Sequence, residues 1–273
     1  MNRHEFLRHL HRVVEPRTYL EIGVSDGRSL TLSMVPSIGI DPAPKVKSPL
    51  HRDAKVVKAT SDDFFARSDP LRHLRGPHPS ALGRLLRRPA SSDGPAPTLD
   101  LAFIDGMHLF EYALRDFMNV ERHCSWTSVI VFDDMLPRDV DEAARDRHTK
   151  FWAGDVFKVG DVLRQHRPEL VVLPVDTAPT GTLVVLGADP QNRILAKAYD
   201  EIVRTWVAPD PQMVPASILS RSDAVAPDRL VAADVWTHVV EARTGNIDRA
   251  EGYPRIRDDL TALLPSEVHQ PFG

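Results

Sequence analysis

The chain of 273 residues is 42% apolar and 26% charged, and its formal net charge is −4. This composition is typical of a globular protein, and the small negative charge gives no overall attraction to nucleic acid or to an anionic membrane. No run of about 18 apolar residues is present, and Cys124 is the single cysteine. We therefore expect no membrane span and no internal disulfide, and a cytoplasmic protein without nucleic-acid or membrane partners.

Apolar residues recur with two different spacings along the chain. Helical spacing predicts helices over residues 3–14 and 109–123 and a short helix over 29–35. Short apolar runs predict strands at residues 18–24, 37–41, 54–60, 99–106 and 128–134. Strands that alternate with helices favour a parallel, doubly wound α/β sheet.

The end of this sheet is predicted to differ from its beginning. Only the four residues "TAPT" separate the apolar runs 169–176 and 181–187, which is too short for a helical crossover between parallel strands. The two runs should therefore form an antiparallel hairpin. The sequence thus predicts a seven-stranded, mostly parallel sheet with a C-terminal antiparallel hairpin and helices on both faces.

Residues 68–98 fall outside this pattern because they are rich in proline and arginine. We expect a helix at 80–88 and otherwise an exposed, mobile surface insertion. The alternative is a basic docking surface for an anionic substrate or partner.

Two helical patterns, at 190–207 and 226–243, follow residue 188 and precede a proline-rich tail. We therefore expect a domain at residues 1–188 and a helical extension at 189–273. The helices of the extension are one place where a homodimer contact could form.

The loop after the first strand, in "YLEIGVSDGRSL", contains Glu21, Gly23 and Gly27. A nucleoside triphosphate site needs a lysine that this loop lacks, and the glycine spacing does not fit the G-x-G-x-x-G of dinucleotide sites. A carboxylate at the strand end favours a cationic ligand over a pyrophosphate. S-adenosylmethionine (SAM), which carries an ammonium and a sulfonium group, is such a ligand.

Acidic or polar residues also follow the next two strands. Asp41 lies 18 positions after Gly23, close to the spacing at which an acidic residue holds a ribose diol. Ser61 and Asp62 follow the third strand and could contact an adenine edge. Each is equally a turn or cap residue by itself, but all of them lie where ligands bind in open α/β sheets.

The segments "YLEIGVSDGRSL", "IGIDP", "FIDGMHLFEYALRDF" and "VIVFDDMLP" together resemble a class I SAM-dependent methyltransferase. The resemblance is to the type-24 methyltransferase domain and, more distantly, to metal-dependent macrolide sugar O-methyltransferases, over roughly residues 17–187. It implies a Rossmann-like methyltransferase fold with SAM as the cofactor.

Three aspartates are predicted to converge at the edge of the sheet where the methyl donor lies. Asp105 ends the fourth strand, and Asp133 and Asp134 end the fifth. Close carboxylates repel one another unless a cation or a proton is shared, and Mg²⁺ takes oxygen ligands. The resemblance implies that these three aspartates hold Mg²⁺. In the alternative, Asp133 or Asp134 only caps a turn and contacts SAM.

The resemblance also implies that His108, three residues after Asp105, is the general base. Imidazole titrates near neutrality and could take a hydroxyl proton. The alternative is that His108 caps the following helix or bonds a carboxylate. Further along, Asp155 is predicted to cap the helix that follows it, and Trp152 and Lys158 could line the acceptor site.

The function predicted from these residues is a SAM-dependent O-methyltransferase that acts on a hydroxyl of a small molecule, sugar or glycoconjugate, assisted by a divalent metal. A metal-free methyltransferase using His108 alone is one alternative. A catalytically inactive SAM-fold binding module is the other. The loop spacing and the hairpin at 169–187 disfavour an NAD-dependent oxidoreductase.

Overall fold

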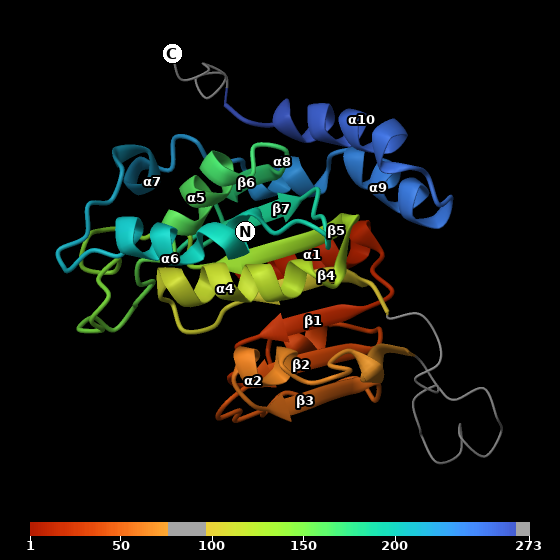
Figure 1. Cartoon of the computed structure of the whole chain (residues 1–273), viewed down its shortest axis with the longest axis horizontal. Coiled ribbons are helices and arrows are strands. Elements are labelled where there is room, and N and C mark those ends of the chain that lie inside the picture. The colour runs from red at the N-terminus through yellow and green to blue at the C-terminus, as the bar shows by residue number, and fades with distance from the viewer. Residues whose placement is uncertain (76–96, 266–273) are drawn as a thin grey trace.

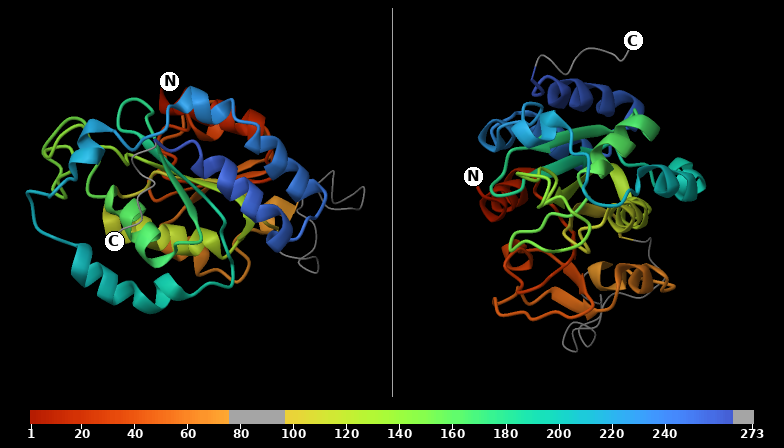
Figure 2. Two further views of the ribbon diagram at one scale, coloured as in Figure 1. Left: turned by 90° about the horizontal axis from the view of Figure 1, so that it is seen from above. Right: turned by 90° about the vertical axis from the view of Figure 1, so that its left-hand side faces the viewer.

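The computed structural model of the protein describes residues 1–75 and 97–265. Seven strands form one sheet in the order β3-β2-β1-β4-β5-β7-β6, with helices on both faces (Figures 1 and 2). The strands are β1 (Tyr19–Ile22), β2 (Ser37–Asp41), β3 (Ala54–Lys58), β4 (Leu99–Ile104), β5 (Cys124–Asp133), β6 (Val171–Val175) and β7 (Thr182–Leu186).

The strand directions confirm the predicted fold class. Strands β1 to β5 pair in parallel, whereas β7 is antiparallel to both β5 and β6. Strand β1 pairs with β2 on one side and with β4 on the other, so the order of strands reverses at β1 and β4. In open α/β sheets, ligands bind at such a switch point, outside the carboxyl ends of the strands.

Two layers of helices cover the sheet, and the central strands supply side chains to both layers. In β1, Leu20 and Ile22 pack on one face and Tyr19 on the other, as the alternation of side chains along a strand requires. The first layer contains α2 (Ser61–Phe65), α4 (Phe110–Glu121), α5 (Lys158–His166) and α6 (Ile194–Trp206). The opposite layer contains α1 (Arg3–Val14), α8 (Pro227–Val231), α9 (Val235–Thr244) and α10 (Arg249–Thr261), and the short α7 (Ala216–Ser220) precedes α8 in the chain.

The C-terminal region differs from the prediction. The helix expected over 226–243 is interrupted at residues 232–234 and forms α8 and α9. The segment expected as a proline-rich tail contains α10, which buries Tyr253, Ile256 and Leu260 at helical spacing against the sheet. Proline normally ends a helix, so Pro254 within α10 concealed this pattern.

Two shorter predictions also need correction. The short helix expected over 29–35 is a single 3₁₀ turn, η1 (Leu30–Leu32). Within the insertion expected to be exposed, residues 72–75 form the 3₁₀ turn η2 (Arg72–Arg75), and Leu71 and Leu74 are buried in the core. The helix predicted at 80–88 lies outside the described residues. Among the described helices, none has both the length and the apolar character needed to cross a membrane.

Candidate active site

A cavity of roughly 590 Å³ opens at the carboxyl edge of the sheet, beside the switch point of β1 and β4. This volume is in the usual range for small-molecule sites. Of the site residues predicted from the sequence, Gly23, Asp41, Ser61, Asp62, Asp105 and His108 line it. The other lining residues are Arg3, Ile22, Ser25, Ile40, Pro42, Ala59, Thr60, Gly106, Met107, Tyr112, Asp116 and Arg147.

Gly23 allows the loop after β1 to pass against β4. Its φ is 90°, and a Cβ atom at this position would lie 1.8 Å from the backbone oxygen of Asp105. Any side chain here would therefore disturb the contact between the loop after β1 and the end of β4. Gly27, with φ 83°, packs beneath Val46 and is not among the residues that line the cavity.

Asp41, which lines the cavity, bonds the loop after β1 and the residues that follow β2. Its two carboxylate oxygens accept hydrogen bonds from the backbone N–H groups of Ser25 (2.8 Å) and Ala43 (2.7 Å). The carboxylate thus fixes the loop after β1 to the end of β2. Ser25 has a φ of 47°, an uncommon conformation for a residue other than glycine.

The far end of the cavity contains an acidic residue that the sequence reasoning missed. Asp116 of α4 is 4% exposed and accepts a hydrogen bond from the Ser61 hydroxyl. Burial raises the pKa of Asp116 to about 7. Asp62, in contrast, forms an ion pair with Arg115 at 2.8 Å. The signal available in the sequence was an aspartate beside the apolar face of the predicted helix at 109–123, where a carboxylate needs a partner.

Glu21 is buried but does not line the cavity. It points to the same face of the sheet as Tyr19, and its carboxyl group accepts hydrogen bonds from the hydroxyls of Tyr19 (2.7 Å) and Ser29 (2.7 Å). Burial raises the pKa of Glu21 to about 8. The Glu21 side chain therefore holds Ser29, which follows the glycine loop, against β1.

The three aspartates at the ends of β4 and β5 lie together, and each has a protein partner. Asp133 accepts a hydrogen bond from the guanidinium of Arg3, and Asp134 accepts one from the Thr180 hydroxyl. Asp105 faces His108. One ligand atom each of Asp105, His108 and Asp134 lies within 4.8 Å of the others. We call Asp105, Asp133 and Asp134 the acidic cluster.

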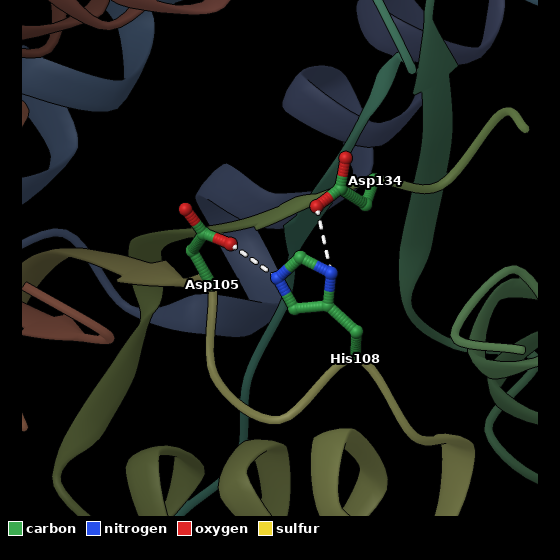
Figure 3. Close-up of side chains that lie close together, drawn as sticks. All are labelled: Asp105, His108 and Asp134. Carbon is green, nitrogen blue, oxygen red and sulfur yellow. Dashed lines mark hydrogen bonds and ion pairs between the residues drawn. The ribbon is translucent and has the colours of Figure 1, made fainter. Parts of the chain in front are cut away.

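The imidazole of His108 lies between two carboxylates of the acidic cluster, as Figure 3 shows. Its Nε2 is 3.0 Å from Asp105 Oδ1, and its Nδ1 is 3.2 Å from Asp134 Oδ2. Burial lowers the pKa of His108, but the hydrogen bond with Asp105 and the charges of Asp134 and Asp105 outweigh it and raise the pKa to about 9. The ring is therefore charged at neutral pH in this arrangement.

Trp152 fixes the His108 ring from the other side. The two rings stack with centroids 5.2 Å apart and an interplanar angle of 14°. The Trp152 carbonyl lies 2.9 Å from Nδ1, so it accepts a hydrogen bond when that nitrogen carries a proton. His108 and Asp134 both have positive φ, 57° and 60°, a strained conformation of a kind that often marks functional sites.

The predicted role of Asp155, in the segment that carries Trp152, is wrong. Asp155 accepts a hydrogen bond from the backbone N–H of Phe110 at 2.9 Å and therefore caps α4. It does not cap α5, which has no side-chain cap. Lys158 is buried and bonds Asp155 (2.9 Å) and Gln212 (2.6 Å). Lys158 does not line the described cavity, whereas Trp152 lies directly against His108.

Comparison with known proteins gives one family match. Residues 20–135 match a family model of type 24 described as a methyltransferase domain. No curated protein matches the sequence significantly.

Several solved structures are similar to the chain at low identity. Cofactor-bound Rv0187 from MTB is 17% identical, with a TM-score of 0.47 over 68% of this chain and 79% of that one. The SAM complex of the O-methyltransferase TomG from Streptomyces achromogenes, involved in tomaymycin synthesis, is 16% identical, with a TM-score of 0.45 over 68% and 79%. The SAH-bound methyltransferase PaMTH1 from Podospora anserina is 14% identical, with a TM-score of 0.44 over 67% and 77%.

The matched segment contains the strands on both sides of the switch point and the acidic cluster. The order of the whole sheet, including the antiparallel strands β7 and β6 beyond the matched segment, is the order predicted for a class I methyltransferase. Residues 20–135 therefore match a methyltransferase domain, within a sheet of the Rossmann-like methyltransferase type.

Proposed function

We propose that this chain is an O-methyltransferase that moves the methyl group of SAM to a hydroxyl of a small molecule, sugar or glycoconjugate. The observation that carries the proposal is His108, a titratable ring held on the cavity wall between Asp105 and Trp152. A hydroxyl acceptor must lose a proton, and a positioned imidazole can take it. We further propose residues 1–188 as the catalytic domain and 189–273 as its helical extension.

The cofactor is proposed to lie across the switch point. Gly23 and Gly27 shape the loop that it approaches, and Asp41 is proposed to accept hydrogen bonds from the ribose hydroxyls. At the adenine end, Ser61 and Asp62 are the proposed contacts. Asp116 joins them because it also lines that end of the cavity.

Asp105 and Glu21 complete the proposed cofactor site in different ways. Asp105 lines the cavity, and its carboxylate would attract the amino or sulfonium group of SAM. Glu21 was predicted as a direct contact, but its bonds to Tyr19 and Ser29 favour an indirect role. We propose that it shapes the glycine loop that SAM approaches.

His108 is proposed to act through Nε2. The Trp152 carbonyl can accept a hydrogen bond from Nδ1–H, so the neutral ring keeps its proton on Nδ1 and presents the lone pair of Nε2. The acceptor oxygen forms a bond to the methyl carbon as the carbon–sulfur bond breaks, the hydroxyl proton passes to Nε2, and S-adenosylhomocysteine (SAH) remains. Asp105 and Asp134 favour the charged ring. The base role therefore requires that these carboxylates bind another partner, such as the cofactor or a metal ion.

The acceptor is proposed to bind beside Met107, Trp152 and Arg147. Met107 is 56% exposed and lines the cavity next to His108. The Arg147 guanidinium lies over the Trp152 ring, 5.7 Å from its centroid. Apolar surface with one cation nearby suits a hydroxylated molecule that also has an apolar face.

A divalent ion such as Mg²⁺ is the finer part of the proposal. Asp105, Asp133 and Asp134 offer the hard oxygen donors that Mg²⁺ takes. Burial and the neighbouring carboxylates raise the pKa of Asp133, because they disfavour its charged form. A bound cation would offset this cost. These three residues would hold the ion, which when bound polarises the acceptor hydroxyl. Metal-free transfer is the second candidate, because Arg3 and His108 already bring positive charge to the cluster.

The test combines SAH calorimetry with transfer of a labelled methyl group from SAM to a panel of hydroxylated acceptors. We expect SAH binding with and without EDTA, and an O-methylated product in the presence of Mg²⁺. Loss of product in EDTA with recovery on added Mg²⁺ supports the metal, whereas full activity in EDTA supports metal-free transfer. SAH binding without turnover of any acceptor indicates a binding module, and no SAH binding contradicts the assignment.

A further inference from the structure

Arg3 brings a positive charge to the acidic cluster from a distant part of the sequence. It is the first residue of α1 and lies 130 positions before Asp133. Its Nη1 donates a hydrogen bond to Asp133 Oδ2 and lies 3.8 Å from Asp105 Oδ2. The Asp133 side chain is 1% exposed and that of Arg3 28%. The guanidinium therefore lies between the buried carboxylate and the cavity, which Arg3 also lines.

The backbone around Arg3 is held in place on both sides. The Asn2 side chain and Glu5 form a reciprocal capping box at the start of α1. The Arg3 N–H donates to the Ala178 carbonyl (3.2 Å), and the Ala178 N–H donates to the Met1 carbonyl (3.0 Å). These bonds fix the start of α1 to the turn between β6 and β7, the same turn that supplies the Thr180 hydroxyl to Asp134.

A divalent ion bound by the whole acidic cluster would need the carboxylate of Asp133. The Arg3 guanidinium already bonds that carboxylate. We propose that Arg3 is a resident counter-cation that competes with divalent ions for Asp133 and so sets the affinity of the cluster for metal. Two cations that approach one carboxylate also repel each other strongly in a partly buried site. This inference rests on the acidic cluster of the proposed function, but it does not depend on methyl transfer.

The experiment is a calorimetric titration of Mn²⁺ into the full-length chain and its variants. Arg3→Met removes the charge and frees Asp133, so we expect Mn²⁺ to bind at least roughly tenfold more tightly than to the parent. Arg3→Lys keeps a charge but loses the planar fork, so its gain should be smaller. Arg8→Met removes an exposed arginine of the same helix, and its Mn²⁺ affinity should equal that of the parent.

A second substitution shows where the gain arises. Adding Asp133→Asn to Arg3→Met should abolish the tighter binding, because the freed carboxylate is then missing. Should Arg3→Met fail to fold by circular dichroism, Arg3→Gln removes the charge while keeping an N–H donor and should also tighten Mn²⁺ binding. Unchanged or weaker affinity in the folded charge-free variant overturns the proposal, as does an absence of Mn²⁺ binding in both parent and variant. Loss of methyl transfer alone leaves this comparison unaffected.

Discussion

Two regions at the same edge of the sheet bury carboxyl groups in opposite ways. At the ends of β4 and β5, the acidic cluster is surrounded by the cations Arg3 and His108. At the end of β1, the hydrogen-bond partners of Glu21 among the residues that the structure describes are only the hydroxyls of Tyr19 and Ser29. Burial raises the pKa of Glu21 to about 8, so this group stays protonated at neutral pH. A buried carboxyl group is neutralised either by a nearby cation or by a proton.

The comparison teaches which region can carry out chemistry. A cluster of charged groups in contact with a cavity can exchange a proton or a cation with a bound molecule. A protonated carboxyl group that bonds only neighbouring hydroxyls provides structural support. We therefore expect substitutions in the first region to change turnover, and substitutions in the second region to change stability.

The largest effect is expected for His108→Ala. Without the proposed base, kcat should fall by about 10²- to 10⁴-fold, the usual scale of general base catalysis. The affinity for SAH should change little, because the proposed ribose and adenine contacts are intact. Turnover of labelled SAM and SAH calorimetry on the same preparation measure both quantities.

His123→Ala is the matched control for that variant. His123 stacks on Phe65 and is not among the residues that line the cavity, so its kcat should equal that of the parent. If His108→Ala also keeps the kcat of the parent, the proton leaves the acceptor without this ring, and His108 is only a partner of Asp105 and Asp134.

The sequence predicted the residues whose positions follow from local pattern. Strand ends in a parallel sheet share one edge, so Gly23, Asp41 and Asp105 could be placed together from the spacing of apolar runs alone. The direction of the Glu21 side chain follows from strand alternation. Its bonds to the hydroxyls of Tyr19 and Ser29 could not be predicted in this way, and Glu21 does not line the cavity.

The missed features depend on contacts between distant parts of the chain. Arg3 reaches Asp133 across 130 positions, and Thr180 reaches Asp134 across 46. No local periodicity encodes such pairs, because they arise only when α1 and the turn between β6 and β7 dock beside the cluster. Likewise, α10 is stabilised by packing of Tyr253 and Ile256 on the sheet, in spite of the proline within it.

A smaller effect is expected at the cofactor end of the cavity. Asp41→Ala should weaken SAH binding by about 1–3 kcal/mol, because the ribose hydroxyls would lose their proposed acceptor. At saturating SAM, kcat should be nearly unchanged, the reverse of the pattern for His108→Ala. Asp41→Asn keeps one acceptor oxygen, so its SAH affinity should lie between those of the parent and Asp41→Ala. Asp53→Ala changes an exposed aspartate, and its SAH affinity should equal that of the parent. Equal SAH affinity in parent and Asp41→Ala would remove Asp41 from the site.

Glu21→Gln tests the other half of the comparison, through the pH dependence of stability and not through turnover. The folded pKa of about 8 lies above the ordinary value of 4.5. Below pH 4.5 both states hold the proton. Between the two values only the folded state holds it, so the free energy of unfolding of the parent should fall as pH rises, by at most about 1.4 kcal/mol per pH unit.

Glutamine has nearly the same shape as glutamic acid but no titrating group, so the variant should lack this fall. The difference in unfolding free energy between Glu21→Gln and the parent should therefore grow in favour of the variant from pH 5 to pH 7 and level off above pH 8. Urea unfolding at each pH measures it. Exposed Glu15→Gln is the control, and its curve should stay parallel to that of the parent. A parallel curve for Glu21→Gln would mean that the buried group has a charged partner after all, and the contrast between the two regions would be lost.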